Sequence, residues 1–199
     1  IKINSNFMNK IYSVSKTLIL FLFLLTNLNI FLMTNDVNAK NTDLENTLYI
    51  DLKDGRVVIE MLPKVAPKHV ERIKTLARQK FYDGIVFHRV ISGFMAQTGD
   101  PTGTGMGGSK LPDLKAEFSD EPHIRGALSM ARSSNPNSAN SQFFIVTDDS
   151  RFLDGQYTVW GRVVSGMEFV DKIKKGAGQN GEVTRPDSML KVRVASDEK

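Results

Sequence analysis

The sequence predicts a mainly β domain, built as an antiparallel barrel or sandwich with two α-helices packed against it. Many short segments alternate apolar and polar residues with a period of two, which is typical of half-buried strands. Only two stretches show the spacing of a helix. Short strands that are joined by frequent turns favour antiparallel pairing over the parallel sheets of alternating α/β proteins.

The first two strands are predicted at residues 47–52 and 56–61, on either side of Lys53-Asp54-Gly55. An Asp-Gly pair between two alternating segments indicates a hairpin. Residues 87–97 are predicted to form two short extended segments that meet at Ser92-Gly93. Further strands are predicted at residues 127–131, 142–146, 157–164 and 189–195.

Two amphipathic helices complete the prediction. Over residues 63–80, apolar side chains recur at helical spacing with lysines and arginines between them. The apolar positions are Val65, Ala66, Val70, Ile73, Leu76 and Ala77. A shorter helix is predicted over residues 167–175.

Composition is that of an ordinary globular protein. Of 199 residues, 41% are hydrophobic and 24% are charged, so the chain can bury a substantial core in one domain. The formal net charge of +4 is mild, and no dense basic run with interleaved aromatic residues points to nucleic acid. The chain has no cysteine, which excludes disulfides, thiolate catalysis and cysteine-ligated zinc.

The N-terminal 39 residues read as a secretory signal peptide. Lys10 and Lys16 precede an apolar run that begins at Thr17, and Ala39 has the small side chain that a signal peptidase favours. We expect cleavage between Ala39 and Lys40 and a location in the periplasm or another extracytoplasmic space. The alternative is an uncleaved membrane anchor, although the run is shorter than the ~20 residues of a comfortable span.

Beyond the leader we expect a short linker at residues 40–46 and one domain at residues 47–197. The most informative stretch of that domain is Phe87 to Gln97, where one arginine and one glutamine stand among large apolar residues. Period-two alternation would put Phe87, Arg89 and Ile91 on one face, and Met95 with Gln97 on one face after the glycine. A guanidinium beside apolar walls suits a neutral substrate with a carbonyl and an apolar ring.

Five ordered motifs carry a resemblance to a known family. They are FHRVISGFMAQTGD (87–100), GTGMGG (103–108), GALSMAR (126–132), NSANSQFFIV (137–146) and FLDGQYTVWGRV (152–163). With these motifs the chain resembles the cyclophilin-type peptidyl-prolyl cis-trans isomerases, in particular their exported bacterial branch. The resemblance implies a closed eight-stranded antiparallel β-barrel capped by two α-helices, and an enzyme that accelerates X-Pro isomerisation during protein folding outside the cytoplasm.

Carried over position by position, the resemblance implies that Arg89 is the catalytic residue. It implies further that ten residues bind the substrate: a proline pocket of Phe94, Met95, Phe144 and Leu153, glutamines Gln97 and Gln142 on the substrate backbone, backbone pairing at Ala131 and Arg132, and an outer wall of Phe152 and Tyr157. The implied partners are proline-containing peptides and unfolded or folding proteins, bound by a monomer without a cofactor or metal. Contact with a membrane is expected only through an uncleaved leader.

Other interpretations of the same residues stay open at this stage. The pattern alone favours Phe94, Met95, Phe144 and Leu153 as core. Gln97 and Gln142 could be solvated strand residues and Tyr157 a surface aromatic, and Trp160 is assigned to packing. The groove could also serve a peptide-binding chaperone that needs no turnover. A small-ligand barrel of the lipocalin type would require an empty apolar interior, whereas the resemblance implies an interior filled by side chains.

Three other chemistries are not favoured. Gly103, Gly105 and Gly108 fit a dinucleotide fingerprint, but Lys110-Leu111-Pro112-Asp113 follows where that motif needs a helix, so we expect a loop beside the substrate groove instead. Ser129 and Ser141 lack a credible histidine and aspartate arrangement in the sequence, which argues against a serine hydrolase. The scattered histidines, His69, His88 and His123, lack the paired spacing of metal ligands, and we expect them to be structural or exposed.

Phe152 stands where well-studied eukaryotic cyclophilins carry tryptophan, and it cannot donate an indole N–H hydrogen bond to cyclosporin. We therefore predict weak cyclosporin binding, measurable by titration calorimetry. A tight complex would contradict this prediction.

Overall fold

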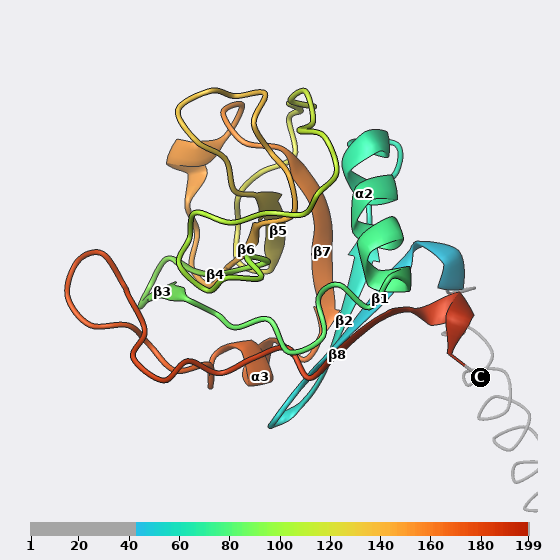
Figure 1. The fold of residues 1–199 in the computed structure, drawn as a ribbon. Coiled ribbons are helices and arrows are strands. Elements are labelled where there is room, and N and C mark those ends of the chain that lie inside the picture. The colour runs from blue at the N-terminus through green and yellow to red at the C-terminus, as the bar shows by residue number, and fades with distance from the viewer. Residues whose placement is uncertain (1–42, 199) are drawn as a thin grey trace, which may run out of the picture. The chain divides into compact units, whose positions relative to one another are not determined.

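The computed structural model describes residues 43–198. Eight antiparallel strands form one curled sheet in the order β3-β4-β6-β5-β7-β2-β1-β8, so the prediction of a mainly β, eight-stranded antiparallel fold is confirmed (Figure 1). The strands are β1 (Thr47–Leu52), β2 (Gly55–Met61), β3 (Arg89–Ile91), β4 (Met95–Thr98), β5 (Ala127–Met130), β6 (Phe143–Val146), β7 (Val159–Ser165) and β8 (Lys191–Val194).

Within the described residues, strands β3 and β8 stand at the two ends of the strand order. In a closed barrel these two strands would pair with each other in a ladder. Irregular segments span this seam instead. Isolated bridges join Val86 to Ser188 and Arg89 to Glu182. Between them, the backbone N–H of Phe87 donates to the carbonyl of Asp187 over 2.8 Å. Loop backbone therefore covers the side of the sheet where the strand ladder stops.

The first two hairpins form where the sequence predicts them. The β1–β2 hairpin turns at Lys53-Asp54, and Gly55, which the sequence placed in the turn, already pairs with Leu52. Strand β3 pairs with β4 through a turn at Ser92-Gly93, where Gly93 has a φ of 69°. One detail of the prediction is wrong: Phe87 does not share a face with Ile91. Phe87 precedes β3 and packs into the main core with Val90, while Ile91 faces the opposite side, because the chain is irregular between Phe87 and β3.

Two α-helices are present in the described part of the chain, and both are shorter than predicted. Helix α2 spans Pro67–Arg78, because Pro67 fits the first helical turn and Lys80, with a φ of 55°, adopts a left-handed conformation that ends it. Helix α3 spans only Met167–Val170. Beyond it the N–H of Lys174 donates to the Asp187 carboxylate instead of to a carbonyl four residues earlier.

Short 3-10 helices complete the fold at η1 (Leu44–Asn46), η2 (Arg151–Leu153) and η3 (Ala195–Asp197). Part of the segment predicted as a linker is thus a helical turn, capped by the Asp43 side chain. None of the described helices is long and apolar enough to cross a membrane. The predicted signal peptide and the rest of the linker, residues 1–42, lie outside the described residues.

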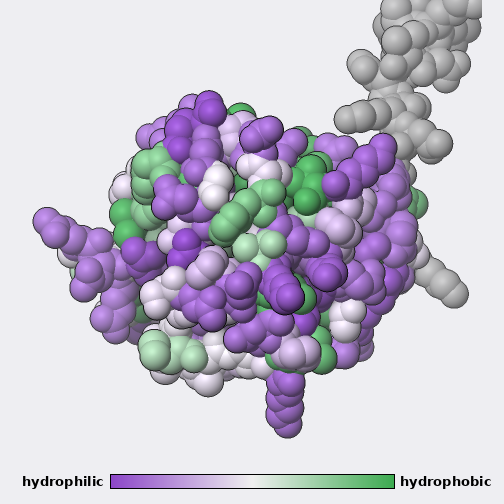
Figure 2. Space-filling model, turned by 90° about the horizontal axis from the view of Figure 1, so that it is seen from above, coloured by the Kyte–Doolittle hydropathy of each residue, from purple (hydrophilic) through white to green (hydrophobic). Residues whose placement is uncertain are grey.

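The main core fills the inside of the curled sheet and the space under α2. Trp160 is fully buried there, edge-on to Phe143 at 5.4 Å, which confirms its expected packing role. Large side chains occupy the interior, unlike a small-ligand barrel. The surface seen from above is largely hydrophilic with separate hydrophobic patches (Figure 2). Among residues 43–198, Met106 and Phe152 are the most exposed large hydrophobic residues.

All three histidines are buried: His69, His88 and His123 are each at most 8% exposed. Burial lowers the pKa of each imidazole below its usual 6.5, even though Glu117 lies beside His69 and Asp154 beside His123. The folded protein therefore favours neutral imidazoles, whereas the unfolded chain takes up protons once the pH falls below about 6.5.

We predict that the free energy of unfolding falls between pH 7.5 and pH 5.5, by on the order of 1 kcal/mol, because protons bind preferentially to the unfolded chain in this window. Urea unfolding followed by Trp160 fluorescence at the two pH values measures the change. A stability that is constant or rises toward pH 5.5 would show that the buried histidines are not held neutral.

Candidate active site

A cavity of about 120 Å³ opens on the outer face of the sheet, beside the β3–β4 hairpin. Nine of the eleven residues expected to make the site line it: Arg89, Phe94, Met95, Gln97, Ala131, Arg132, Phe144, Leu153 and Tyr157. They come from strands, loops and η2, spread over about 70 positions of the chain. Gln142 and Phe152, the remaining two, lie beside the cavity.

Strand pairing brings the central residues together. Arg89 of β3 lies opposite Gln97 of β4, and Gln97 lies opposite Phe144 of β6. Directly paired residues of antiparallel strands project from the same face, so these three side chains form one row across the sheet. Met95, two positions before Gln97, joins the same face, as the alternation predicts.

One side of the cavity is apolar. Met95, Phe144 and Leu153 are each less than 10% exposed and form a second hydrophobic cluster, separate from the main core. Tyr157 packs edge-on against Phe144, with the ring centroids 6.0 Å apart. The core interpretation of these side chains is therefore correct as to their burial, but they are buried around a cavity rather than inside the barrel.

Phe152 lies at the rim of the cavity. Its ring is tilted by 40° against Phe94 at a centroid distance of 5.5 Å, and 66% of its surface is exposed. It therefore extends the apolar wall outward to solvent.

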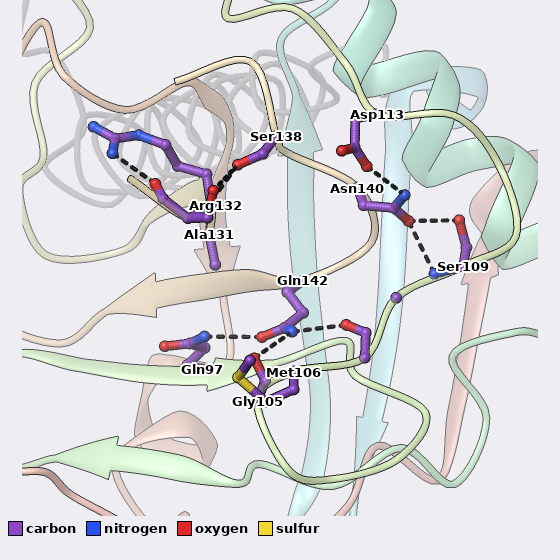
Figure 3. A pocket seen from close by; sticks show the side chains of 13 residues that line it. Gln97, Gly105, Met106, Ser109, Asp113, Ala131, Arg132, Ser138, Asn140 and Gln142 are labelled. Carbon is purple, nitrogen blue, oxygen red and sulfur yellow. Dashed lines mark hydrogen bonds between the residues drawn. The ribbon is translucent and has the colours of Figure 1, made fainter. Parts of the chain in front are cut away.

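A chain of hydrogen bonds holds the polar side chains. Arg89 Nη1 donates to Gln97 Oε1 over 3.2 Å, and Gln97 Nε2 donates to Gln142 Oε1 over 2.9 Å. Gln142 Nε2 in turn donates to the carbonyls of Gly105 and Gly107, over 3.0 and 2.8 Å (Figure 3). The two glutamines are thus members of a fixed network that ends at the guanidinium, and not freely solvated strand residues.

Residues 47–194 match the family model described as cyclophilin type peptidyl-prolyl cis-trans isomerase/CLD. The chain belongs to the cyclophilin-type peptidyl-prolyl cis-trans isomerase family. It is an enzyme of that class, which interconverts the cis and trans forms of X-Pro peptide bonds.

Curated relatives and solved structures agree with this family. A probable peptidyl-prolyl cis-trans isomerase of Brucella suis is 56% identical over 173 residues, covering 81% of this chain and 88% of the relative. The Schizosaccharomyces pombe peptidyl-prolyl cis-trans isomerase ppi1 is 40% identical over 158 residues, covering 76% of this chain and 95% of the relative.

Two solved structures share the fold. The crystal structure of cyclophilin AquaCyp293 from Hirschia baltica matches with a TM-score of 0.71 and 30% identity, over 79% of this chain and 76% of that one. A Cryptosporidium parvum cyclophilin, crystallised in the presence of the dipeptide Ala-Pro, matches with a TM-score of 0.69 and 28% identity, over 74% of this chain and 98% of that one.

In this cyclophilin, the glycine-rich segment forms a loop beside the site, as predicted from the sequence. The loop wraps around Asp100, whose carboxylate accepts the backbone N–H groups of Thr102, Thr104, Gly105 and Gly107. Although burial by itself raises the pKa of Asp100, these backbone donors lower it to about 2. An ionised carboxylate therefore holds the carbonyls of Gly105 and Gly107 where Gln142 needs them.

A second, larger hollow of about 510 Å³ adjoins the first and shares Gln97, Ala131 and Arg132 with it (Figure 3). Its lining is more polar. Apart from Gln142, its other residues were not predicted as site residues, although several lie within or next to the quoted motifs. They are Gly105, Met106, Gly107, Gly108, Ser109, Asp113, Ser133, Ser138 and Asn140.

One backbone donor of the stretch expected to pair with a bound peptide is already used within the protein. The N–H of Ala131 donates to the Gln142 carbonyl over 3.0 Å, so this donor is not available to a bound peptide. The Arg132 guanidinium lies 4.3 Å from the Tyr157 ring centroid and donates to the carbonyls of Ser133 and Gln156. Arg132 therefore braces the Tyr157 side of the cavity.

Ser129 has a histidine and an aspartate nearby in the folded protein, although no such arrangement is recognisable in the sequence. The structure brings His123 Nε2 within 3.0 Å of Ser129 Oγ and His123 Nδ1 within 3.1 Å of Asp154 Oδ1, from positions that no sequence motif links. The hydroxyl of Ser129 donates to the Thr158 carbonyl, however, and both Ser129 and His123 are fully buried. His123 stacks on Phe144, so this trio supports the cavity wall and offers no reachable nucleophile.

We predict that a fluorophosphonate, which modifies the nucleophilic serines of hydrolases, leaves Ser129 unlabelled in the folded protein because no reagent can reach the buried hydroxyl. Intact-mass spectrometry, with a serine hydrolase as the positive control, tests this. A mass gain that disappears in the Ser129→Ala variant would contradict the buried, supporting role.

Proposed function

We propose that this enzyme isomerises X-Pro bonds with Arg89 as the group that stabilises the transition state and the adjoining cavity as the site for the proline ring. The observation that carries the proposal is the position of a guanidinium, held by neutral hydrogen-bond acceptors, at the edge of a cavity with one apolar wall. The proposed mechanism needs no general base, nucleophile or metal.

Isomerisation of an X-Pro bond requires little more than this arrangement. Rotation about an X-Pro bond breaks amide resonance, and the uncatalysed reaction takes on the order of tens to hundreds of seconds although the two ground states differ by only about 1 kcal/mol. At the twisted transition state the prolyl nitrogen regains its lone pair. A donor aimed at that nitrogen binds the transition state more tightly than either planar form, which is the condition for catalysis.

Each part of the site then has a role in this proposal. Met95, Phe144 and Leu153 hold the pyrrolidine ring and exclude water, which strengthens the hydrogen bond from Arg89. Gln97 orients the guanidinium from the side facing the second hollow. Gln142 connects it to the glycine-rich loop and stands where it can meet the substrate backbone.

The substrate in this proposal is a proline-containing segment of an unfolded or folding protein. The two adjoining hollows suit an extended peptide, with proline against the apolar wall of the smaller one and a flanking residue in the larger, more polar one. Phe94 and Phe152 offer further apolar surface at the rim. The Ala-Pro dipeptide that accompanied the Cryptosporidium parvum relative is the smallest ligand of this type.

We propose further that the enzyme acts outside the cytoplasm, as a monomer of an exported bacterial branch of the family. The support is the sequence alone: Lys10 and Lys16, the apolar run from Thr17, and Ala39 before Lys40. Immunoblotting of periplasmic and membrane fractions, with a variant lacking residues 1–39 as the control, tests this location.

The rival proposal is a chaperone that uses the same groove to hold unfolded chains. It predicts that function depends on binding of the client chain and not on the orientation of the Arg89 guanidinium. The apolar wall of the cavity and the exposed Phe152 would suffice for such a role.

We predict that Arg89→Ala lowers kcat/KM for a short X-Pro peptide by about 100-fold, the usual order for removing one donor to a transition state. Isomerisation is measured by protease-coupled or NMR exchange assay. Arg89→Lys should also lose activity because an ammonium lacks the rigid fork, whereas Arg78→Ala, on the exposed face of α2, should not.

The same variants separate the rival proposals. A chaperone would suppress the aggregation of an unfolded client equally well with or without the Arg89 side chain and would show no loss of function in the Arg89→Ala variant. Full isomerase activity in Arg89→Ala would rule out the proposed role of the guanidinium.

A further inference from the structure

The loop that follows α3 reaches back across the seam to Arg89. In Figure 1 it extends from the body of the molecule beside β3. The backbone carbonyl of Asn180 accepts a hydrogen bond from Arg89 Nε over 3.0 Å. This contact joins residues 91 positions apart. We refer to residues 176–182 as the arginine loop.

The base of the arginine loop is pinned to β3. The N–H of Val90 donates to the Gly181 carbonyl over 2.7 Å, and the N–H of Gly176 donates to the Val90 carbonyl over 2.9 Å. Ala177 and Glu182 close the neck with a hydrogen bond of 3.0 Å. Because these contacts involve the strand that carries Arg89, they fix the position of the loop relative to that residue.

We propose that the arginine loop is a positioning element that aims the Arg89 guanidinium into the active site, an inference that rests on the proposed role of Arg89. A guanidinium is planar, so fixing two of its three nitrogens fixes its plane. Nε is held by the Asn180 carbonyl and Nη1 by the Gln97 side chain, from opposite ends. Nη2 is thereby left to donate to substrate.

The two acceptors that hold Arg89 are uncharged, which also suits this role. Arg56, Arg125 and Arg193 each pair with a carboxylate, as arginines that stabilise a fold commonly do. The two bonds of Arg89 go to a backbone carbonyl and a carboxamide, which are uncharged. These acceptors orient the guanidinium without neutralising the positive charge that the transition state needs.

Two glycines of the loop provide a matched test. Gly181 and Gly178 have nearly the same left-handed φ, 70° and 65°, so a Cβ strains the backbone similarly at both. At Gly178 a Cβ would meet no atom within 4 Å. At Gly181 it would lie 2.9 Å from the Val90 carbonyl oxygen and 2.4 Å from Ile91 Cγ1, so the loop must move off β3.

We predict that Gly181→Ala lowers kcat/KM by about 10-fold, mainly through kcat, whereas Gly178→Ala stays within about 2-fold of the unmodified protein. The double variant Gly181→Ala with Arg89→Ala should lose no more activity than Arg89→Ala alone, because the loop acts through that side chain. A merely structural role would instead add a further loss in the double variant, and that result would overturn the proposal.

A spectroscopic measurement on the unmodified protein keeps the test independent of how the variants fold. In ¹H–¹⁵N spectra, the Arg89 Nε–H proton should exchange with water more slowly than that of free arginine, because the Asn180 carbonyl protects it, and Gly181→Ala should abolish the protection. Exchange as fast as in free arginine would overturn the inference. If the unmodified protein shows protection but no isomerase activity, the proposed function fails while the contact itself stands.

Discussion

The antiparallel pairing of β3, β4 and β6 is the constraint on which the site depends. It places Arg89, Gln97 and Phe144 in one row, so a cation, its orienting amide and the floor of the cavity come from three paired positions. A shift of any strand by one residue would turn these side chains into the core and bring core residues to the surface. Packing on the inner face holds the register, since Val90, Ala96, Phe143 and Ile145 are buried there.

Two loops supply the hydrogen-bond acceptors that hold Arg89 and Gln142 from outside the paired strands. The glycine-rich loop, folded around the ionised Asp100, supports Gln142, and the arginine loop meets Arg89 at the seam between β3 and β8. Both supply backbone carbonyls, which are acceptors without charge. The polar side of the site is thus built from hydrogen bonds that orient a cation yet leave it charged, while carboxylates pair with arginines elsewhere in the fold.

Much of the fold and of the site was predictable from local sequence pattern. The β1–β2 and β3–β4 hairpins follow from alternation and turn residues, and α2 from apolar spacing with Pro67 in its first turn. The motifs also led to Arg89 and most of the cavity lining. Local pattern failed at two places. Helix α3 ends at Val170 and the N–H of Lys174 goes to the distant Asp187 carboxylate, and an irregular chain before β3 turns Phe87 into the main core.

By itself the sequence determined the strand-rich class, the amphipathic helix, the absence of thiol chemistry and the residue types that line the cavity, because these depend on composition and on neighbours along the chain. Only the tertiary structure decided that Ser129, His123 and Asp154 meet in a buried cluster, that Ala131 donates its N–H to Gln142, and that Asn180 holds Arg89. Such contacts join distant positions, often through backbone atoms that every residue carries, so no pattern of side chains along the chain encodes them.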